Sequence, residues 1–273
     1  MNSIFTAVIL VSVIGAFCAL ILVIAAKFFS VKEDEKYKQI RECLPGANCG
    51  ACGYTGCDGY AKALAEDADV KCNLCTPGAD ETARKISEIL KVDFQDVVEK
   101  VAIIHCYGDC EHTSDKLEYV GIQSCVAAKM YYGGKRKCSF ACLGFGDCVS
   151  VCPQGAICIN KDIAHIDTRK CIGCGICVNV CPVHIIDIMP DVERVLITCS
   201  NTDKGAVARS QCTNGCIGCK KCEKICESGA IKVVDNLARI DYDKCTKCEK
   251  CAENCPSGCI VVSNFNGLHR FKK

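Results

Sequence analysis

Tryptophan is absent from this chain of 273 residues, and all aromatic residues together make up only 6 % of it. Large apolar cores are therefore expected to be scarce, because aromatic side chains supply much of the buried area in most domains. A charge surplus is also absent, since the formal net charge is +1. This balance argues neither for a nucleic-acid-binding surface nor for an acidic disordered tail.

The common catalytic and nucleotide-binding motifs are missing as well. We find no G-x-G-x-x-G fingerprint at a strand-to-helix turn and no G-x-x-x-x-G-K-[ST] phosphate loop. No nucleophile elbow and no pair of carboxylates stands out, and the five histidines show no ligand spacing. We therefore predict no catalytic residue, and no cofactor site other than metal clusters.

Cysteine, in contrast, is in large excess, with 30 residues. Such a density is typical either of disulfide scaffolds or of metal proteins. Disulfide scaffolds are mostly small secreted domains with spread cysteines, whereas here the cysteines come in tight local sets. Metal ligation is the better interpretation, and it requires reduced thiols, which indicates the cytoplasm.

One long apolar run begins the chain. Residues 4–26 carry no charge, and as a helix they are long enough to cross a hydrocarbon core of about 30 Å. A cleaved signal peptide fits less well, because no basic residue precedes the run and the run is too long. Lys27 and Lys32 follow, so the positive-inside tendency predicts a single-pass anchor in a bacterial cell (inner) membrane, with the iron–sulfur domains on the cytoplasmic side.

A cysteine motif recurs along the second half of the chain. Three complete copies have the spacing C-x2-C-x2-C-x3-C: Cys171, Cys174, Cys177 and Cys181; Cys216, Cys219, Cys222 and Cys226; Cys245, Cys248, Cys251 and Cys255. A fourth copy, Cys142, Cys148 and Cys152, has Phe145 at its second position. The copies pair at an offset of 74 residues, which also relates Cys125 to Cys199 and Cys138 to Cys212. This regularity indicates an internal duplication.

The spacing C-x2-C-x2-C-x3-C-P is the bacterial ferredoxin run, in which three thiolates hold one [4Fe–4S] cluster and the fourth holds its neighbour. This crossed rule predicts three ligand sets: Cys152 with Cys171, Cys174 and Cys177; Cys226 with Cys245, Cys248 and Cys251; and Cys255 with Cys216, Cys219 and Cys222. A fourth set contains Cys142, Cys148 and Cys181. We predict that Cys138 completes it.

A separate set precedes the repeats. Cys49, Cys52, Cys57 and Cys75 suit a [4Fe–4S] cluster of their own, with Cys43 and Cys72 as non-ligands. Residues 80–102 then show helical spacing and predict a packing helix.

Cysteines between the first set and the repeats are harder to group. Cys106, Cys110 and Cys125 need one more donor, for which Cys138, Cys199, Cys212 and Cys158 compete. Setting aside Cys18, Cys43, Cys72 and Cys259 leaves 26 cysteines, enough for about six [4Fe–4S] clusters, and Cys158 is the favoured spare.

Two other metal chemistries agree less well with the spacing. Zinc ribbons use C-x2-C pairs, but with two pairs per site rather than crossed quartets. The spacing of Cys212, Cys216 and Cys219 also matches radical-SAM enzymes, but no barrel-sized domain surrounds it.

The N-terminal apolar run, then "CGACGYTGC" with a later "CTPG", then ferredoxin motifs including "CLGFGDCVSVCP", resembles the B subunit of the Rnf complex, in its long multi-cluster form. That complex is a bacterial ion-translocating ferredoxin:NAD+ oxidoreductase. The resemblance covers nearly the whole chain. It departs from the pattern at Glu227, which stands where proline is expected after Cys226, and in the extra Cys43, Cys72 and Cys158.

The resemblance implies an electron-transport subunit without a substrate-converting site of its own. It would accept electrons from soluble ferredoxin and pass them to other subunits of the membrane complex, with no nucleic-acid partner. A polyferredoxin subunit of another membrane oxidoreductase, such as a hydrogenase, is the alternative, and a structural zinc protein is a more remote one.

We therefore expect an α+β chain. Its predicted parts are a transmembrane anchor at 1–28, a small helical [4Fe–4S] domain at 29–100, a cysteine-rich connector at 101–137, and tandem duplicated bacterial 2[4Fe–4S] ferredoxin-like domains at 138–195 and 196–267.

Overall fold

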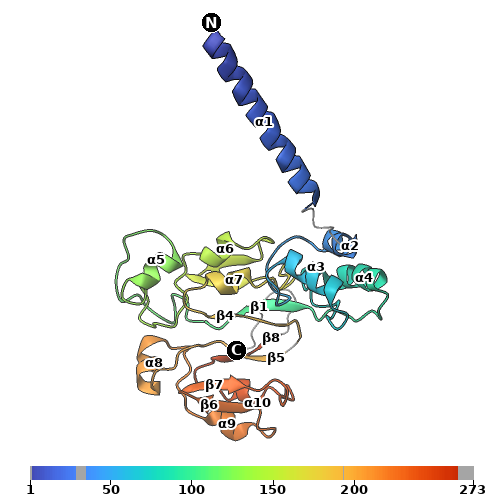
Figure 1. Cartoon of the computed structure of the whole chain (residues 1–273). Coiled ribbons are helices and arrows are strands. Elements are labelled where there is room, and N and C mark those ends of the chain that lie inside the picture. Colours follow the sequence, from blue (N-terminus) through green and yellow to red (C-terminus); the bar gives the residue numbers. More distant parts are fainter. Residues whose placement is uncertain (1, 29–34, 193, 264–273) are drawn as a thin grey trace.

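The computed structural model describes residues 2–28, 35–192 and 194–263. Lys32 and the last four residues of the second predicted ferredoxin-like domain, 264–267, lie outside the described residues. Within them the chain forms a long N-terminal helix and a body of short helices and strands (Figure 1). The mixed α+β class predicted from the sequence is confirmed.

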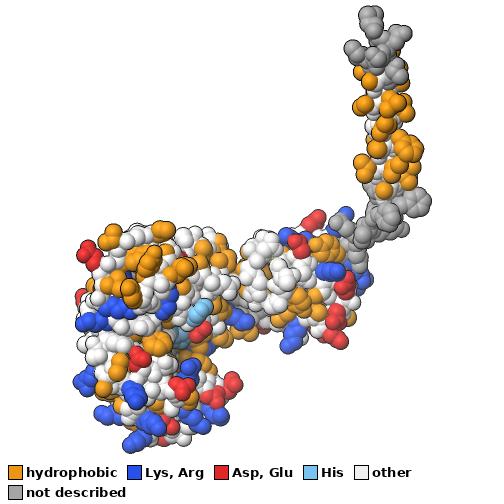
Figure 2. Space-filling view, turned by 60° about the vertical axis from the view of Figure 1, so that its left-hand side comes forward, with side chains coloured by type: hydrophobic (Ala, Val, Ile, Leu, Met, Phe, Trp, Pro, Cys, Tyr) orange, Lys and Arg blue, Asp and Glu red, His pale blue; other side chains and the backbone are white. Residues whose placement is uncertain are grey.

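The long helix α1 spans Asn2–Phe28 and points away from the body (Figures 1 and 2). Its segment Ala7–Ala25 has a mean hydropathy of 3.1, and none of it is buried against the rest of the chain. An uncharged helix of this length, with apolar side chains on every side, is long and apolar enough to cross a bilayer.

Three helices form the next unit: α2 (Glu35–Cys43), α3 (Cys57–Glu66) and α4 (Ala79–Leu90). Helix α2 packs against both others, and Ile40, Tyr60 and Ile86 are almost completely buried between them. The Tyr60 hydroxyl donates a hydrogen bond to the carbonyl oxygen of Lys71 at 2.6 Å, which ties the loop before Cys75 to α3.

The helix predicted at 80–102 is confirmed only as far as Leu90. Lys91 has a φ of 57°, the left-handed conformation that commonly ends a helix. The carboxylate of Asp80 then accepts a hydrogen bond from the backbone N–H of Val97 at 2.8 Å. The remaining part is a loop and the start of strand β1 (Lys100–Ile104), so the helical prediction was wrong for this part of the segment.

Four antiparallel strand pairs make up the rest of the body. Strand β1 pairs with β4 (Ile186–Pro190), β2 (Ile157–Asn160) with β3 (Ile163–Ile166), β5 (Arg194–Ile197) with β8 (Ile260–Ser263), and β6 (Ile231–Val234) with β7 (Leu237–Ile240). Short helices accompany them: α5 (Cys125–Met130), α6 (Asp147–Ser150), α7 (Ile176–Val180), α8 (Gly205–Gln211), α9 (Lys221–Ile225) and α10 (Lys250–Glu253).

The strands reproduce the internal duplication. Strands β2, β3 and β4 each begin 74 residues before β6, β7 and β8. Strands β1 and β5 complete the two halves at a different offset: Ile104 pairs with Ile186, and Ile197 pairs with Ile260 at the duplicated position. We call residues 100–190 the first half and 194–263 the second half. The predicted domain boundaries stay a prediction, and we propose that the first ferredoxin-like domain begins with β1.

The two halves meet through their first strands. Val101 and Ile103 of β1 are buried against Leu196 of β5 and Val261 of β8. Beyond β1, the ring nitrogen Nδ1 of His105 lies 2.7 Å from the carbonyl oxygen of Ile197. An apolar strand-to-strand contact and a buried polar contact therefore hold the halves in a fixed relation.

Arg136 is the largest side chain that is almost completely buried, at 2 % exposure. Its guanidinium lies 3.3 Å from an oxygen of Asp115 and donates a hydrogen bond to the carbonyl oxygen of Asp162 at 3.0 Å. We expect Arg136→Ala to lower the free energy of unfolding by about 2 kcal/mol, because the substitution leaves a cavity and unpaired acceptors.

The exposed neighbour Lys137 provides the control, and Lys137→Ala should change stability by about 0.5 kcal/mol or less. Denaturant unfolding of both variants measures the difference. Equal stabilities would show that the buried guanidinium does not fasten the connector.

Candidate iron–sulfur sites

The cysteines of the described body gather in groups of four. In the N-terminal unit, the thiol of Cys75 lies close enough to interact electrostatically with those of Cys49, Cys52 and Cys57. Cys57 opens α3, while Cys49 and Cys52 lie in the glycine-rich loop before it. We call this group set N. It has the membership predicted from the spacing.

Set A consists of Cys152, Cys171, Cys174 and Cys177, which line one cavity together with Ala102 of β1. The backbone N–H of Ala102 donates a hydrogen bond to Sγ of Cys171 at 3.3 Å, and that of Ala156 donates to Sγ of Cys152 at 3.3 Å. This is the crossed grouping predicted from the sequence, with one thiol supplied by the preceding motif.

Set B differs from the prediction in one member. Cys142, Cys148 and Cys181 line a cavity together with Cys125, the first residue of α5. Cys138, which we predicted here, lies elsewhere. The turn after it, closed by the N–H of Ala141 on the carbonyl oxygen of Cys138, accompanies a thiol that instead accepts a 3.4 Å hydrogen bond from the side-chain amide of Asn201.

Sets C and D belong to the second half. In set C, Cys222 interacts with Cys216, Cys219 and Cys255, again in the crossed pattern. In set D, Cys251 interacts with Cys245 and Cys248, and Cys226 packs against the same core as Cys251. The assignment of Cys226 to set D follows from its equivalence to Cys152 at the 74-residue offset.

A sixth group joins residues that the sequence did not group. Cys106, Cys138, Cys199 and Cys212 line a single cavity between the two halves. We call it the bridging set. Two signals in the sequence pointed to it: Cys138 and Cys212 lie 74 residues apart, and each of Cys106 and Cys199 follows an apolar run.

Six cysteines remain outside these sets. Cys18 lies in α1, Cys110 and Cys158 are exposed, and Cys43 and Cys72 pack in the core of the N-terminal unit. Cys110 was predicted as a ligand, but among the described residues it lines none of the three cysteine cavities. Cys259 is buried, with its Sγ 3.7 Å from Sγ of Cys255, and stays predicted as a non-ligand.

The electrostatics of the sets call for a positively charged group. Burial raises the pKa of Cys148 and of Cys177 to about 12, and the neighbouring thiols raise it further. The same causes raise the pKa of Cys75 and of Cys222 to about 11. Iron ions supply the charge that keeps such thiols deprotonated, and N–H groups that donate to sulfur are typical neighbours of a cluster. The donor sets therefore fit [4Fe–4S] clusters.

Glycines bring the backbone close to the motifs. Gly144 has a φ of +76°, and a Cβ on it would lie 2.5 Å from the carbonyl oxygen of Asp162. Gly218, 74 residues later, has a φ of +62° and faces the carbonyl oxygen of Asn236 in the same way. Only glycine fits these two positions, since both the conformation and the available space exclude a side chain.

Comparisons with known proteins match both regions of the chain. Residues 44–77 match the family model "Putative Fe-S cluster", residues 164–187 match "4Fe-4S binding domain", and residues 215–259 match "4Fe-4S dicluster domain". The chain therefore carries iron–sulfur domains, which argues against the zinc alternative.

Curated relatives cover most of the chain. The B subunit of the Na(+)-translocating ferredoxin:NAD(+) oxidoreductase complex of Acetobacterium woodii is 40 % identical over 90 % of this chain and 74 % of the relative. The proton-translocating counterpart of Clostridium ljungdahlii is 39 % identical, over 90 % and 87 %. The B subunit of the ion-translocating oxidoreductase complex of Methanosarcina acetivorans is 34 % identical, over 85 % and 88 %. With this coverage and these motifs, the chain belongs to the family of B subunits of Rnf-type ion-translocating oxidoreductase complexes.

Proposed function

We propose that this chain accepts electrons from reduced ferredoxin and relays them through about six [4Fe–4S] clusters to other subunits of a membrane-bound ion-translocating ferredoxin:NAD+ oxidoreductase. The supporting observation is the contact between neighbouring cysteine sets. Cys174 of set A interacts with Cys49 of set N, and Cys148 of set B interacts with Cys177 of set A. Groups held this close together suit electron transfer from one to the next.

The residues of this chain hold and tune the clusters rather than convert a substrate. Each set offers four thiols, so no iron is left open to a substrate, and outer-sphere electron transfer is the chemistry that the clusters supply when bound. Hydrogen bonds from the N–H groups of Ala102 and Ala156 to cysteine sulfur stabilise negative charge at set A. NAD and flavin chemistry is therefore assigned to other subunits.

Membrane attachment is assigned to α1, with the sets on the cytoplasmic side. Lys27 directly follows the apolar segment, in agreement with the positive-inside tendency. The segment Ala7–Ala25 contains no charged residue. It therefore offers no ion-binding group of its own, and ion translocation is a property of the whole complex.

Metal analysis and ferredoxin reduction test this proposal. The full-length protein, purified without oxygen, should contain about 24 irons with an equal amount of sulfide, from six clusters of four irons. Reduced ferredoxin should bleach its visible absorption in a rapid second-order reaction. Tightly bound zinc with little sulfide would contradict the cluster assignment, whereas full clusters that ferredoxin does not reduce would contradict only the choice of donor.

A further inference from the structure

The bridging set is built from two equivalent pairs of thiols. Cys138 of the first half corresponds to Cys212 of the second at the 74-residue offset. Cys106 and Cys199 also correspond, because each follows by two residues the strand end whose isoleucine pairs at an equivalent position, Ile104 or Ile197. Each half therefore contributes the same two thiols to one cavity.

The surroundings of the two pairs repeat as well. The backbone N–H of Cys142 donates to Sγ of Cys106 at 3.3 Å, and the N–H of Cys216, its equivalent, donates to Sγ of Cys199 at 3.2 Å. The thiols of Cys106 and Cys212 are both buried. The cavity between the four thiols has about 340 Å³ of space not filled by atoms, against about 340 Å³ and 360 Å³ for sets A and B.

Asn201 adds polar contacts that single out this cavity. Its side-chain amide donates to Sγ of Cys138 at 3.4 Å, and its backbone N–H donates to Sγ of Cys199 at 3.4 Å. The residue is 2 % exposed, so both donors are directed at sulfur within the protein. Hydrogen bonds of this kind stabilise negative charge on thiolates that hold a metal cluster.

From this arrangement we infer that Cys106, Cys138, Cys199 and Cys212 hold a [4Fe–4S] cluster at the pseudo-twofold interface of the two ferredoxin-like halves. None of the four lies within the residues that the iron–sulfur family models match. The ligand assignment stands on the geometry alone, whereas the role of the cluster in electron transfer rests on the proposed function.

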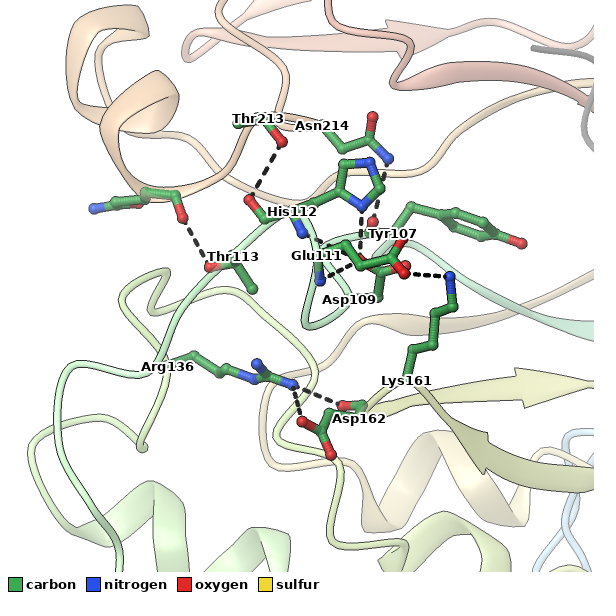
Figure 3. A network of polar contacts seen from close by, with 11 residues as sticks. Tyr107, Asp109, Glu111, His112, Thr113, Arg136, Lys161, Asp162, Thr213 and Asn214 are labelled. Atoms are coloured by element: carbon green, nitrogen blue, oxygen red, sulfur yellow. Dashed lines mark hydrogen bonds and ion pairs between the residues drawn. The ribbon is translucent and has the colours of Figure 1, made fainter.

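The loop between Cys106 and Cys138 is fastened to both halves beside this site (Figure 3). Glu111 pairs with Lys161 of the first half at 2.7 Å. On the other side, the carbonyl oxygen of His112 accepts a hydrogen bond from the backbone N–H of Thr213 at 2.9 Å, and Thr113 donates to the carbonyl oxygen of Gln211 at 2.7 Å. These contacts fix Cys106 and Cys212 relative to each other.

The bridging set also completes a linear order. Through Cys106 and the N–H of Cys142 it touches set B, and through Cys199 and the N–H of Cys216 it touches set C. Set C shares a crossed motif with set D, as set B does with set A. The six sets thus follow one another as N, A, B, bridging, C and D, and the bridging set connects the two halves.

Iron content of four single variants tests the assignment. In the full-length protein, Cys106→Ala, Cys138→Ala, Cys199→Ala and Cys212→Ala should each lower iron from about 24 to about 20 per chain. The double variant Cys106→Ala/Cys199→Ala should lose no more than either single one, because both thiols serve one cluster. Cys110→Ala and Cys158→Ala, which change exposed cysteines outside the sets, should keep all the iron.

Unchanged iron in the four variants would overturn the assignment, as would additive losses in the double variant or a collapse of iron content in all four. Position is tested by EPR of the dithionite-reduced protein. Removal of the bridging cluster should narrow the signals of the remaining clusters, because sets B and C each lose a paramagnetic neighbour. Signals of unchanged shape would place the lost cluster away from the interface. Neither readout depends on which donor reduces the protein in the cell.

Discussion

Cys125→Ala should remove about four irons from the full-length protein, and a second substitution, Phe145→Cys, should restore them. Cys125 closes set B from outside the ferredoxin motif, whereas Phe145 occupies the motif position that holds cysteine in the other three copies. The Phe145 side chain packs against Cys125 in one small core, so a thiol introduced there starts on the correct side of the cavity.

The local structure explains why Cys125 is well placed. Asp147, at the start of α6, accepts hydrogen bonds from the N–H of Cys125 at 2.9 Å and of Val126 at 3.0 Å. The Ser124 hydroxyl also donates to the same carboxylate at 2.9 Å. The carboxylate thus binds the first turn of α5 and fixes the thiol beside the motif that begins at Cys142.

Iron and sulfide analysis of the single and rescued variants measures this effect. The double variant Cys125→Ala/Cys138→Ala should lose about eight irons, because its two thiols belong to different sets. If Cys125→Ala keeps its iron, or if the double variant loses only about four, the grouping of set B is wrong and the sequence-based choice of Cys138 is correct.

Removal of residues 1–28 should move the protein from the membrane to the soluble fraction almost completely. The deleted helix exposes apolar side chains throughout Ala7–Ala25, and burying that surface in lipid is the main contribution to membrane binding. None of the six cysteine sets includes a residue of α1, so the truncated protein should keep about 24 irons.

This experiment should be done without the other subunits, followed by ultracentrifugation in high salt. Cys18→Ala, a substitution within the intact helix, is the control and should leave the protein in the membrane fraction. A truncated protein that still sediments with membranes would show that the body binds lipid by another surface. A truncated protein without iron would show that α1 supports folding of the N-terminal unit.

The sequence was most informative where ligands are close together in the chain. The motif spacing and the 74-residue offset were enough to place Cys152 beside Cys171 and Cys255 beside Cys216, because short loops leave the backbone few alternatives. The same reasoning failed for Cys138. Four residues separate it from Cys142, but the turn at Ala141 and the amide of Asn201 accompany a thiol directed to another cavity.

The first strand of each half shows a second limit. The apolar stretch at 100–104 follows a helical pattern, and nothing within it identifies Ile186, more than eighty residues later, as a partner. Pairing of distant strands is decided by tertiary contacts, here by the burial of Val101 and Ile103 against the second half. The offset between β1 and β5 also differs from that of the motifs, so the duplication did not reveal it.

The equivalence of the two thiol pairs has a consequence for the origin of this architecture. A single ferredoxin-like half carries Cys106 and Cys138, or Cys199 and Cys212, and thus only half of a ligand set. Such a half could complete the site only by association with a second copy of itself around a twofold axis. The present chain has the arrangement expected of an ancestral homodimer whose two genes fused, with an intermolecular cluster retained as an internal one.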